Sequence, residues 1–119
     1  MAPEFSQLKK QRYLSLASFR KSGEEVRTPL WFAEQNGTLF VMTRDDSWKY
    51  KRIRNNPQVR VAPCTARGRV TGAWSDAVAR VLPREAEAPA RAALQSKYWL
   101  LRIPWLWSKK NVFIALTSR

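Results

Sequence analysis

The sequence contains no histidine, and Cys64 is its only cysteine. The first absence excludes a Ser-His or Cys-His catalytic pair and an ordinary zinc site, and the second excludes a disulfide bond within the chain. We therefore predict no metal site. Any chemistry must come from a bound cofactor or from Lys, Arg, Tyr, Asp or Glu side chains, and the sequence does not identify which residues are catalytic.

Acidic residues are also scarce, because 22 Lys and Arg residues face only 9 Asp and Glu residues, giving a net charge of +13. Such a surplus attracts anionic partners: nucleic acid, a phosphorylated cofactor or an acidic membrane surface. Long apolar runs are missing too. None approaches the ~18 residues of a membrane span, and residues 1–8 lack the regions of a signal peptide. We predict a cytoplasmic protein without a membrane span.

The sequence does contain enough apolar residues for a core. Hydrophobic residues make up 45% of the 119 positions, which indicates a folded chain and not a disordered one. This length predicts a single domain over residues 1–119. In a domain of this size, a deep active site can require a second subunit.

Alternation of apolar and polar residues with period two predicts strands over Tyr13–Phe19, Val26–Ala33 and Thr38–Thr43. The second and third strands are joined by Gln35-Asn36-Gly37, a hairpin turn signal because Asn-Gly readily adopts positive φ. Pro29 interrupts the second strand. Since proline cannot donate to a sheet ladder, it indicates an edge, a bulge or a place where the backbone meets a ligand.

The remaining segments complete a mainly β fold. The patterns predict two further strands over Gln58–Cys64 and Val70–Leu82, and a closing strand over Asn111–Thr117. They also predict an alanine-rich helix over Glu85–Leu101 and a short N-terminal helix over Phe5–Lys10. About six antiparallel strands with short helices are best satisfied by a small β-barrel.

The segment Thr43–Pro57 (TRDDSWKYKRIRNNP) joins a strand end to a basic helix start, with five basic residues: Arg44, Lys49, Lys51, Arg52 and Arg54. Asp45, Asp46 and Ser47 are all acceptable N-caps, so a helix should begin here. Unpaired N–H groups of a first turn and the helix dipole favour a phosphate. Two interpretations stay open: a phosphate cradle for a nucleotide-like cofactor, and a solvated basic helix face.

Several stretches, in unbroken order over roughly residues 14–82, match a known family: LASFRKSG (16–23), RTPLWF (27–32), residues 43–59, APC (62–64) and RGRVTG (67–72). The sequence resembles the split β-barrel flavoproteins related to pyridoxamine 5'-phosphate oxidase. Within them it is most similar to the small branch of enzymes that depend on the deazaflavin coenzyme F420. The resemblance implies an FMN-binding type of split barrel that forms a homodimer, with cofactors in the grooves between subunits.

The resemblance also implies site residues. The phosphate would be held by Thr43, Ser47, Lys49 and Lys51, with Lys49 the foremost. The ring system would lie against Thr28, Pro29, Leu30 and Trp31, and Cys64 and the turn from Arg67 to Arg69 would approach the cofactor less closely. In related branches the position of Ser47 is often basic, so the hydroxyl departs from the family pattern.

The expected function is that of an oxidoreductase, which would transfer hydride between F420, or alternatively FMN, and an unidentified small substrate. The long acidic tail of F420 suits a basic groove. The alternative is a non-catalytic binder of anionic ligands, either a cofactor carrier or a binder of single-stranded nucleic acid through basic residues interleaved with Trp48, Tyr50 and Trp74. Nucleic acid is the less favoured partner, because the basic residues concentrate at one helix start.

Several residues keep two interpretations. Trp31 and Phe32 can be core or ring contacts, and Cys64 is more typical of a small buried apolar residue than of a reactive thiol. A proton donor, if one is needed, would be Tyr50, Tyr98 or water. The aromatic segment Tyr98–Trp107 (YWLLRIPWLW) favours an interface or a pocket wall.

Overall fold

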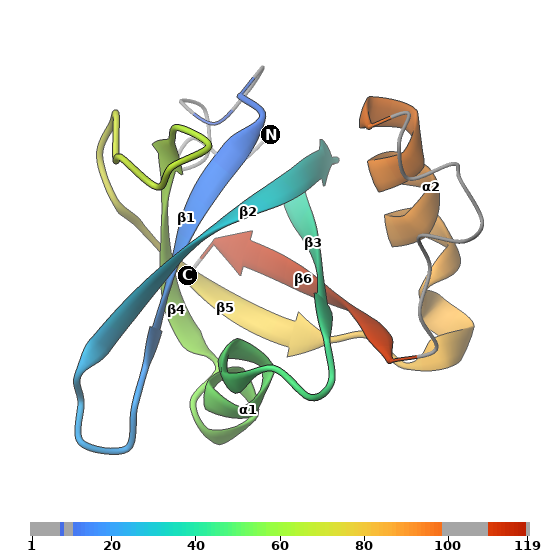
Figure 1. Ribbon diagram of the computed structural model, residues 1–119. Helices are drawn as coiled ribbons and strands as arrows, with labels where there is room; N and C mark the ends of the chain where they lie inside the picture. Colours follow the sequence, from blue (N-terminus) through green and yellow to red (C-terminus); the bar gives the residue numbers. More distant parts are fainter. Residues whose placement is uncertain (1–7, 9–10, 99–109, 119) are drawn as a thin grey trace.

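A computed structural model describes residue 8, residues 11–98 and residues 110–118 (Figure 1). Six antiparallel strands form a closed barrel in the order β1-β2-β3-β6-β5-β4, which confirms the predicted fold class. The elements are β1 (Tyr13–Phe19), β2 (Glu25–Gln35), β3 (Thr38–Arg44), α1 (Trp48–Asn55), β4 (Gln58–Cys64), β5 (Ser75–Val81), the 3-10 helix η2 (Arg84–Ala86), α2 (Ala88–Lys97) and β6 (Asn111–Ser118).

The fifth strand is shorter than the expected Val70–Leu82. Residues 65–74 form a loop, in which Val70 makes only an isolated bridge with Cys64 and the Thr71 N–H bonds to the Pro63 carbonyl at 2.9 Å. The chain therefore folds back on β4 before β5 begins at Ser75. Gly68 allows this reversal, because it adopts a φ of +90° that side chains with a Cβ rarely take.

The alanine-rich helix is also shorter than expected within the described residues. It begins at Ala88 after η2, with Pro89 in the first turn, and it ends at Lys97 because Tyr98 is extended. Residues 99–101 of the predicted helix, most of the predicted N-terminal helix and all of the aromatic segment except Tyr98 lie outside the described residues.

The barrel interior holds one core, and α2 builds a second one outside. Leu14, Leu16 and Ile114 are among the fully buried interior residues, and Ile53 of α1 packs against the same cluster. Figure 1 places α1 at one end of the barrel and α2 alongside β3 and β6. Phe113 of β6 packs in a separate cluster with α2. Because both faces of β6 are covered, residues 111–116 are all buried.

Tyr98 joins the end of α2 to the barrel. Its ring stacks on Trp31 with centroids 4.8 Å apart, and its hydroxyl accepts the Phe32 N–H at 3.2 Å. The same hydroxyl lies 2.6 Å from the Arg12 carbonyl and 2.7 Å from the Phe32 carbonyl. The β1–β2 register ends at Tyr13 opposite Trp31, so Arg12 and Phe32 would be the next pair. The hydroxyl thus bridges the position where the ladder stops.

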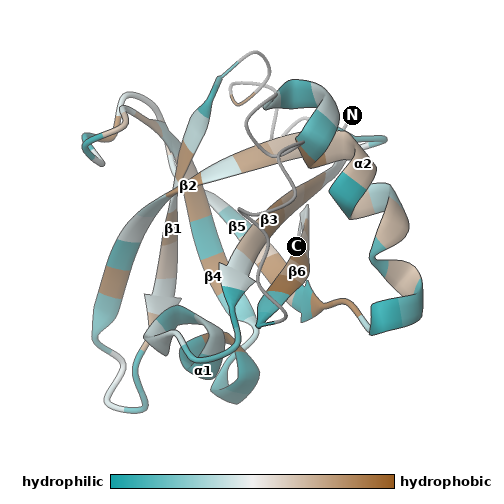
Figure 2. Ribbon diagram, turned by 45° about the vertical axis from the view of Figure 1, so that its right-hand side comes forward, coloured by the Kyte–Doolittle hydropathy of each residue, from teal (hydrophilic) through white to brown (hydrophobic). Residues whose placement is uncertain are grey.

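Neither helix in the described part of the chain combines the length and the hydropathy that crossing a bilayer requires. Figure 2 shows how hydrophilic α1 is in comparison with the strands behind it.

Candidate functional site

The first half of β2 has one open side. Residues 25–31 pair with β1, whereas the register with β3 starts only at Phe32 opposite Val41 among the described strands. Backbone groups of an antiparallel strand point alternately to its two sides. The Arg20 N–H bonds to the Glu24 carbonyl at 2.9 Å, so Pro29, opposite Ser15, belongs to the pairs that do not bond to β1. Of the three alternatives that Pro29 left open, the described strands show an edge position.

An apolar pocket of about 270 Å³ lies beside this open edge. It is lined by Tyr13, Pro29, Leu30, Trp31, Met42 and Leu94. Pro29, Leu30 and Trp31 are among the site residues predicted from the sequence. Tyr13, Met42 and Leu94 are not, and they come from β1, β3 and α2. Phe32 is 1% exposed and belongs to the barrel core, while Trp31 is half-buried on the outside. Phe32 is thus a core residue, whereas Trp31 packs against the outer cluster and its contact with a ring stays a prediction.

The turn at residues 65–69 packs against the same edge. A Cβ on Gly68 would lie 3.6 Å from the Pro29 Cγ, so the backbone of the turn contacts that proline, while Arg67 is exposed. Cys64 is 5% exposed, and burial raises the pKa of its thiol. Cys64 therefore has the character of a small buried apolar residue, as its sequence context favours.

The hydroxyls of Thr43 and Ser47 build the start of α1. The Ser47 Oγ accepts the Tyr50 N–H at 3.2 Å, donates to the Arg44 carbonyl at 2.8 Å and lies 3.1 Å from the Thr43 Oγ1. Ser47 is therefore the N-cap, one of the three predicted. Thr43 is only 7% exposed, so its hydroxyl contacts Ser47 and not solvent.

The basic residues after this cap differ in their surroundings. Lys49 is half-buried, and its pKa is lowered first by burial and then by repulsion from Arg52. The Lys51 Nζ is exposed and lies 4.5 Å from the Trp48 ring centroid. Arg44 pairs with Asp46 at 3.1 Å, and this hydrogen bond is the main reason that the pKa of the Asp46 carboxyl falls to about 2.

A basic pocket of about 830 Å³ lies over α1 and the β1–β2 turn. It is lined by Arg20, Lys21, Asp45, Trp48, Tyr50, Lys51, Arg52, Arg54 and Asn55. Five of these residues are basic and one is acidic. Of the predicted site residues only Lys51 lines this pocket, and neither pocket is lined by Thr28, Thr43, Ser47 or Lys49.

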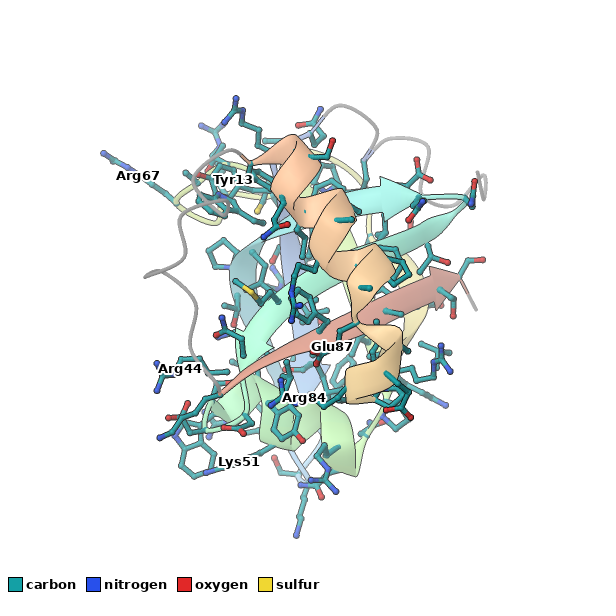
Figure 3. The ribbon with its side chains drawn as sticks, turned by 90° about the vertical axis from the view of Figure 1, so that its right-hand side faces the viewer. Tyr13, Arg44, Lys51, Arg67, Arg84 and Glu87 are labelled. Carbon is teal, nitrogen blue, oxygen red and sulfur yellow. The ribbon has the colours of Figure 1, made fainter. Side chains whose placement is uncertain are left out.

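The predicted site residues thus form two groups, one beside the open edge of β2 and the turn at residues 65–69, and one at the start of α1. Figure 3 shows Tyr13 and Arg67 at one end, and Arg44 and Lys51 at the other. Met42 links the groups, because it lines the apolar pocket and directly precedes Thr43. Within the described residues no cluster of acidic or cysteine side chains could hold a metal ion.

No protein-family model matches the chain, and no curated protein matches it by sequence. Solved structures do match. The heme storage protein HutZ from Vibrio cholerae has a TM-score of 0.77 at 16% identity, over 98% of this chain and 89% of that chain. An FAD-binding protein from Mesorhizobium loti has a TM-score of 0.67 at 21% identity, over 94% of this chain and 82% of that chain.

A candidate pyridoxamine 5'-phosphate oxidase from Listeria innocua also has a TM-score of 0.67, at 15% identity over 99% of this chain and 94% of that chain. In two further matches this chain spans only 50% and 57% of the other protein. At such identities the likeness concerns the fold. The chain has the split-barrel fold that flavin-binding and heme-binding proteins share.

Proposed function

We propose that this protein binds coenzyme F420, or alternatively FMN, and acts with it as an oxidoreductase on a small substrate. The observation that carries the proposal is the continuity of two features on one strand. Met42 lines the apolar pocket, and the basic start of α1 follows immediately after β3. A cofactor with a planar ring joined by a short linker to a phosphate requires an apolar wall next to a cationic one.

The ring end fits the residues beside β2. Pro29, Leu30 and Trp31 offer an apolar surface, and the open strand edge offers backbone groups for hydrogen bonds to a heterocycle. Tyr98 holds Trp31 by stacking, so this wall has a fixed orientation. The role of these residues is to orient the ring and to exclude water. Thr28 and Arg67 are adjacent to this wall, and Cys64 contributes only packing beneath it.

The phosphate end fits the start of α1. Since Ser47 caps the Tyr50 N–H, the N–H groups of Trp48 and Lys49 are the remaining donors of the first turn. The Lys49 ammonium is partly removed from water, where its attraction to an anion is stronger than at an exposed site. Lys51 adds a second charge. Thr43 acts by positioning Ser47, which changes its predicted role.

When bound, F420 or FMN supplies hydride transfer, so the protein need only bind, orient and shield it. This division of labour suits a sequence without histidine. Tyr98 is an unsuitable proton donor, because its hydroxyl is committed to strand backbone and burial raises its pKa to about 12. Tyr50 or water is left for that role. A second subunit would cover the open side of β2, and the 119 residues would then act as one domain per subunit.

Heme is a second candidate cofactor, because a heme storage protein shares this fold. Histidine is the usual proximal ligand of heme in several classes of protein, and this sequence has none. Cys64, a conceivable thiolate ligand, is buried with a raised pKa. Hemin is therefore best used as a comparison ligand in the test that follows.

The test is a fluorescence-quenching titration with F420, FMN and hemin, which the six tryptophans make sensitive. We expect a dissociation constant of about 1 μM or lower for F420 or FMN. The Lys49→Ala variant should bind at least about tenfold more weakly, because a charge-assisted phosphate contact is lost. The matched control is Arg80→Ala, which removes one positive charge from an exposed position of β5 and should leave binding unchanged.

The proposal would be contradicted if neither F420 nor FMN showed saturable binding. If hemin alone bound tightly, heme would replace F420 and FMN as the proposed cofactor. If binding occurs, reduction or oxidation of the bound cofactor by a panel of small substrates distinguishes an enzyme from a cofactor carrier. A carrier would bind with the same dependence on Lys49 and would show no turnover.

A further inference from the structure

Of the residues proposed to hold the cofactor phosphate, only Lys51 lines the basic pocket, so FMN, which carries one phosphate, would leave most of this pocket unused. We call this region the α1 outer surface and define it by Arg20 and Lys21 of the β1–β2 turn together with Trp48, Lys51, Arg52 and Arg54. A single phosphate at the start of α1 needs few of these cations. The basic pocket, with a volume of about 830 Å³, is also larger than one phosphate requires.

The ion pairs of the described residues lie mostly elsewhere. Asp46 pairs with Arg44 and Lys110, and Glu25 pairs with Arg27 and Arg60. Buried Glu87 pairs with two arginines of the α2 region. On the α1 outer surface, the ion pair is the exposed one between Arg20 and Glu24. In the part of the chain that the structure describes, Lys51, Arg52 and Arg54 form no ion pair, so the positive charge of this surface is largely uncompensated.

Three cations of this surface, Lys51, Arg52 and Arg54, contact neutral groups. The Arg52 Nε donates to the Ser18 Oγ at 2.7 Å, the Lys51 Nζ lies 4.5 Å from the Trp48 ring, and the Arg54 guanidinium lies 5.7 Å from the Tyr50 ring. The pKa of Arg52 is lowered by partial burial and by repulsion from Arg20. An anion placed between these side chains would relieve that repulsion.

Trp48 adds a stacking surface. It is 72% exposed, and it is the one exposed large hydrophobic side chain among the described residues. Lys51 lies over its ring, and the rest of the indole is accessible. Tyr50 is engaged by Arg54, and Trp74 lies between Arg27 and Arg60 at 4.7 Å and 5.2 Å. Among the aromatic side chains described at this surface, Trp48 is thus the one placed to stack on a base, whereas tracking a nucleic-acid strand needs successive aromatic side chains.

We propose that the α1 outer surface is a second binding site, which takes a nucleoside polyphosphate. The base stacks on Trp48, and the phosphates are bound by Arg20 and Arg54, with Lys51 shared between this site and the proposed cofactor phosphate. A row of phosphates matches several basic side chains, of which only Arg20 has an ion pair in the described residues, and the pocket volume lies in the range of small-molecule sites, about 300–1,000 Å³. Asp45 is the one carboxylate that lines the pocket, and it does not offset five basic residues.

The test is calorimetric titration of the full chain with ATP and with tripolyphosphate, which has the phosphates without the base. Trp48→Ala should weaken ATP binding about tenfold and leave tripolyphosphate binding within about twofold, because only stacking is lost. Arg54→Ala should weaken both ligands by a similar factor of about five to ten. Arg80→Ala, with the same loss of charge, should change neither. Thermal melts of each variant establish that it is folded.

Equal affinity of the wild type for ATP and tripolyphosphate would overturn the proposal, as would an Arg80→Ala effect as large as that of Arg54→Ala. Competition by a single-stranded oligonucleotide that binds more tightly than ATP would replace the mononucleotide with a strand. The result is separable from the cofactor proposal. Lys49→Ala should weaken F420 or FMN and spare ATP, and Trp48→Ala should do the reverse.

Discussion

At the scale of the residue, Lys97 and Tyr98 contact residues that lie far away along the chain, and these contacts shift the pKa of both side chains. The Tyr98 hydroxyl bridges Arg12 and Phe32, 86 and 66 positions away along the chain. The Lys97 ammonium bonds to the Gln11 carbonyl and lies 3.8 Å from the Phe32 ring centroid. From the sequence, Tyr98 was a candidate proton donor and the first residue of an aromatic segment expected at an interface or a pocket wall. Nothing local reveals that its hydroxyl bridges two strands.

The pH dependence of stability should report Lys97. Burial, aided by Arg12 and opposed by Glu34, lowers its pKa from 10.5 to about 8. Between these values the unfolded chain binds more protons than the folded one, so this group makes stability rise with pH. Burial raises the pKa of Tyr98 from 10.0 to about 12, which makes stability fall over that upper range. The effect of Lys97 on stability is therefore separate from that of Tyr98 between about pH 8 and pH 10.

Urea denaturation of the wild type and of Lys97→Met across this window provides the measurement. The wild type should gain stability relative to the variant as the pH rises from 8 to 10. The two curves should stay parallel below pH 7, where Lys97 is protonated in both states. Parallel curves throughout would show that the Lys97 ammonium is not desolvated.

At the scale of the element, local signals located the strands well and their ends less well. β1, β3, β4 and β6 match their predicted positions within one residue, because alternation and the Asn-Gly turn act over a few neighbours. The segment from Val70 was expected to be strand because of its composition. Residues 65–74 form a loop and not a strand, because the Thr71 N–H donates a hydrogen bond to the Pro63 carbonyl and Gly68 contacts Pro29. Neither contact can be read from composition.

The N-cap of α1 gives a prediction at this scale. Ser47→Ala should destabilise the protein by about 1 kcal/mol, because the bonded Tyr50 N–H loses its partner. Ser47→Asp should keep most of the stability, since a carboxylate also caps a helix, yet it should weaken F420 or FMN binding by adding negative charge at the proposed phosphate position. Urea denaturation and cofactor titration of both variants test this pair. A Ser47→Asp protein that binds the cofactor normally would place the phosphate elsewhere.

At the scale of the whole molecule, the open side of β2 and the net charge have opposite effects on dimerisation. The edge beside the apolar pocket favours association with a second copy, as the family resemblance implies. A charge of +13 disfavours it through mutual repulsion, which salt screens.

We therefore expect a homodimer at micromolar concentration and about 0.15 M salt. Sedimentation equilibrium should give twice the chain mass of 13.8 kDa. Dimerisation should strengthen as salt is added, because screening reduces the repulsion. A monomer at all concentrations and salt levels would contradict the shared groove, and the cofactor would then have to bind a single subunit.

The sequence by itself determined the chemical limits and the local framework. The absence of histidine, the excess of Lys and Arg, the alternation of the strands and an N-cap among Asp45, Asp46 and Ser47 are properties of single residues or close neighbours. The tertiary structure decided which groups meet. It buried Thr43 under α1, brought Leu94 to the pocket beside Trp31, and joined Tyr98 to the end of β1. These contacts depend on how six strands close into a barrel, and closure pairs residues far apart in the chain.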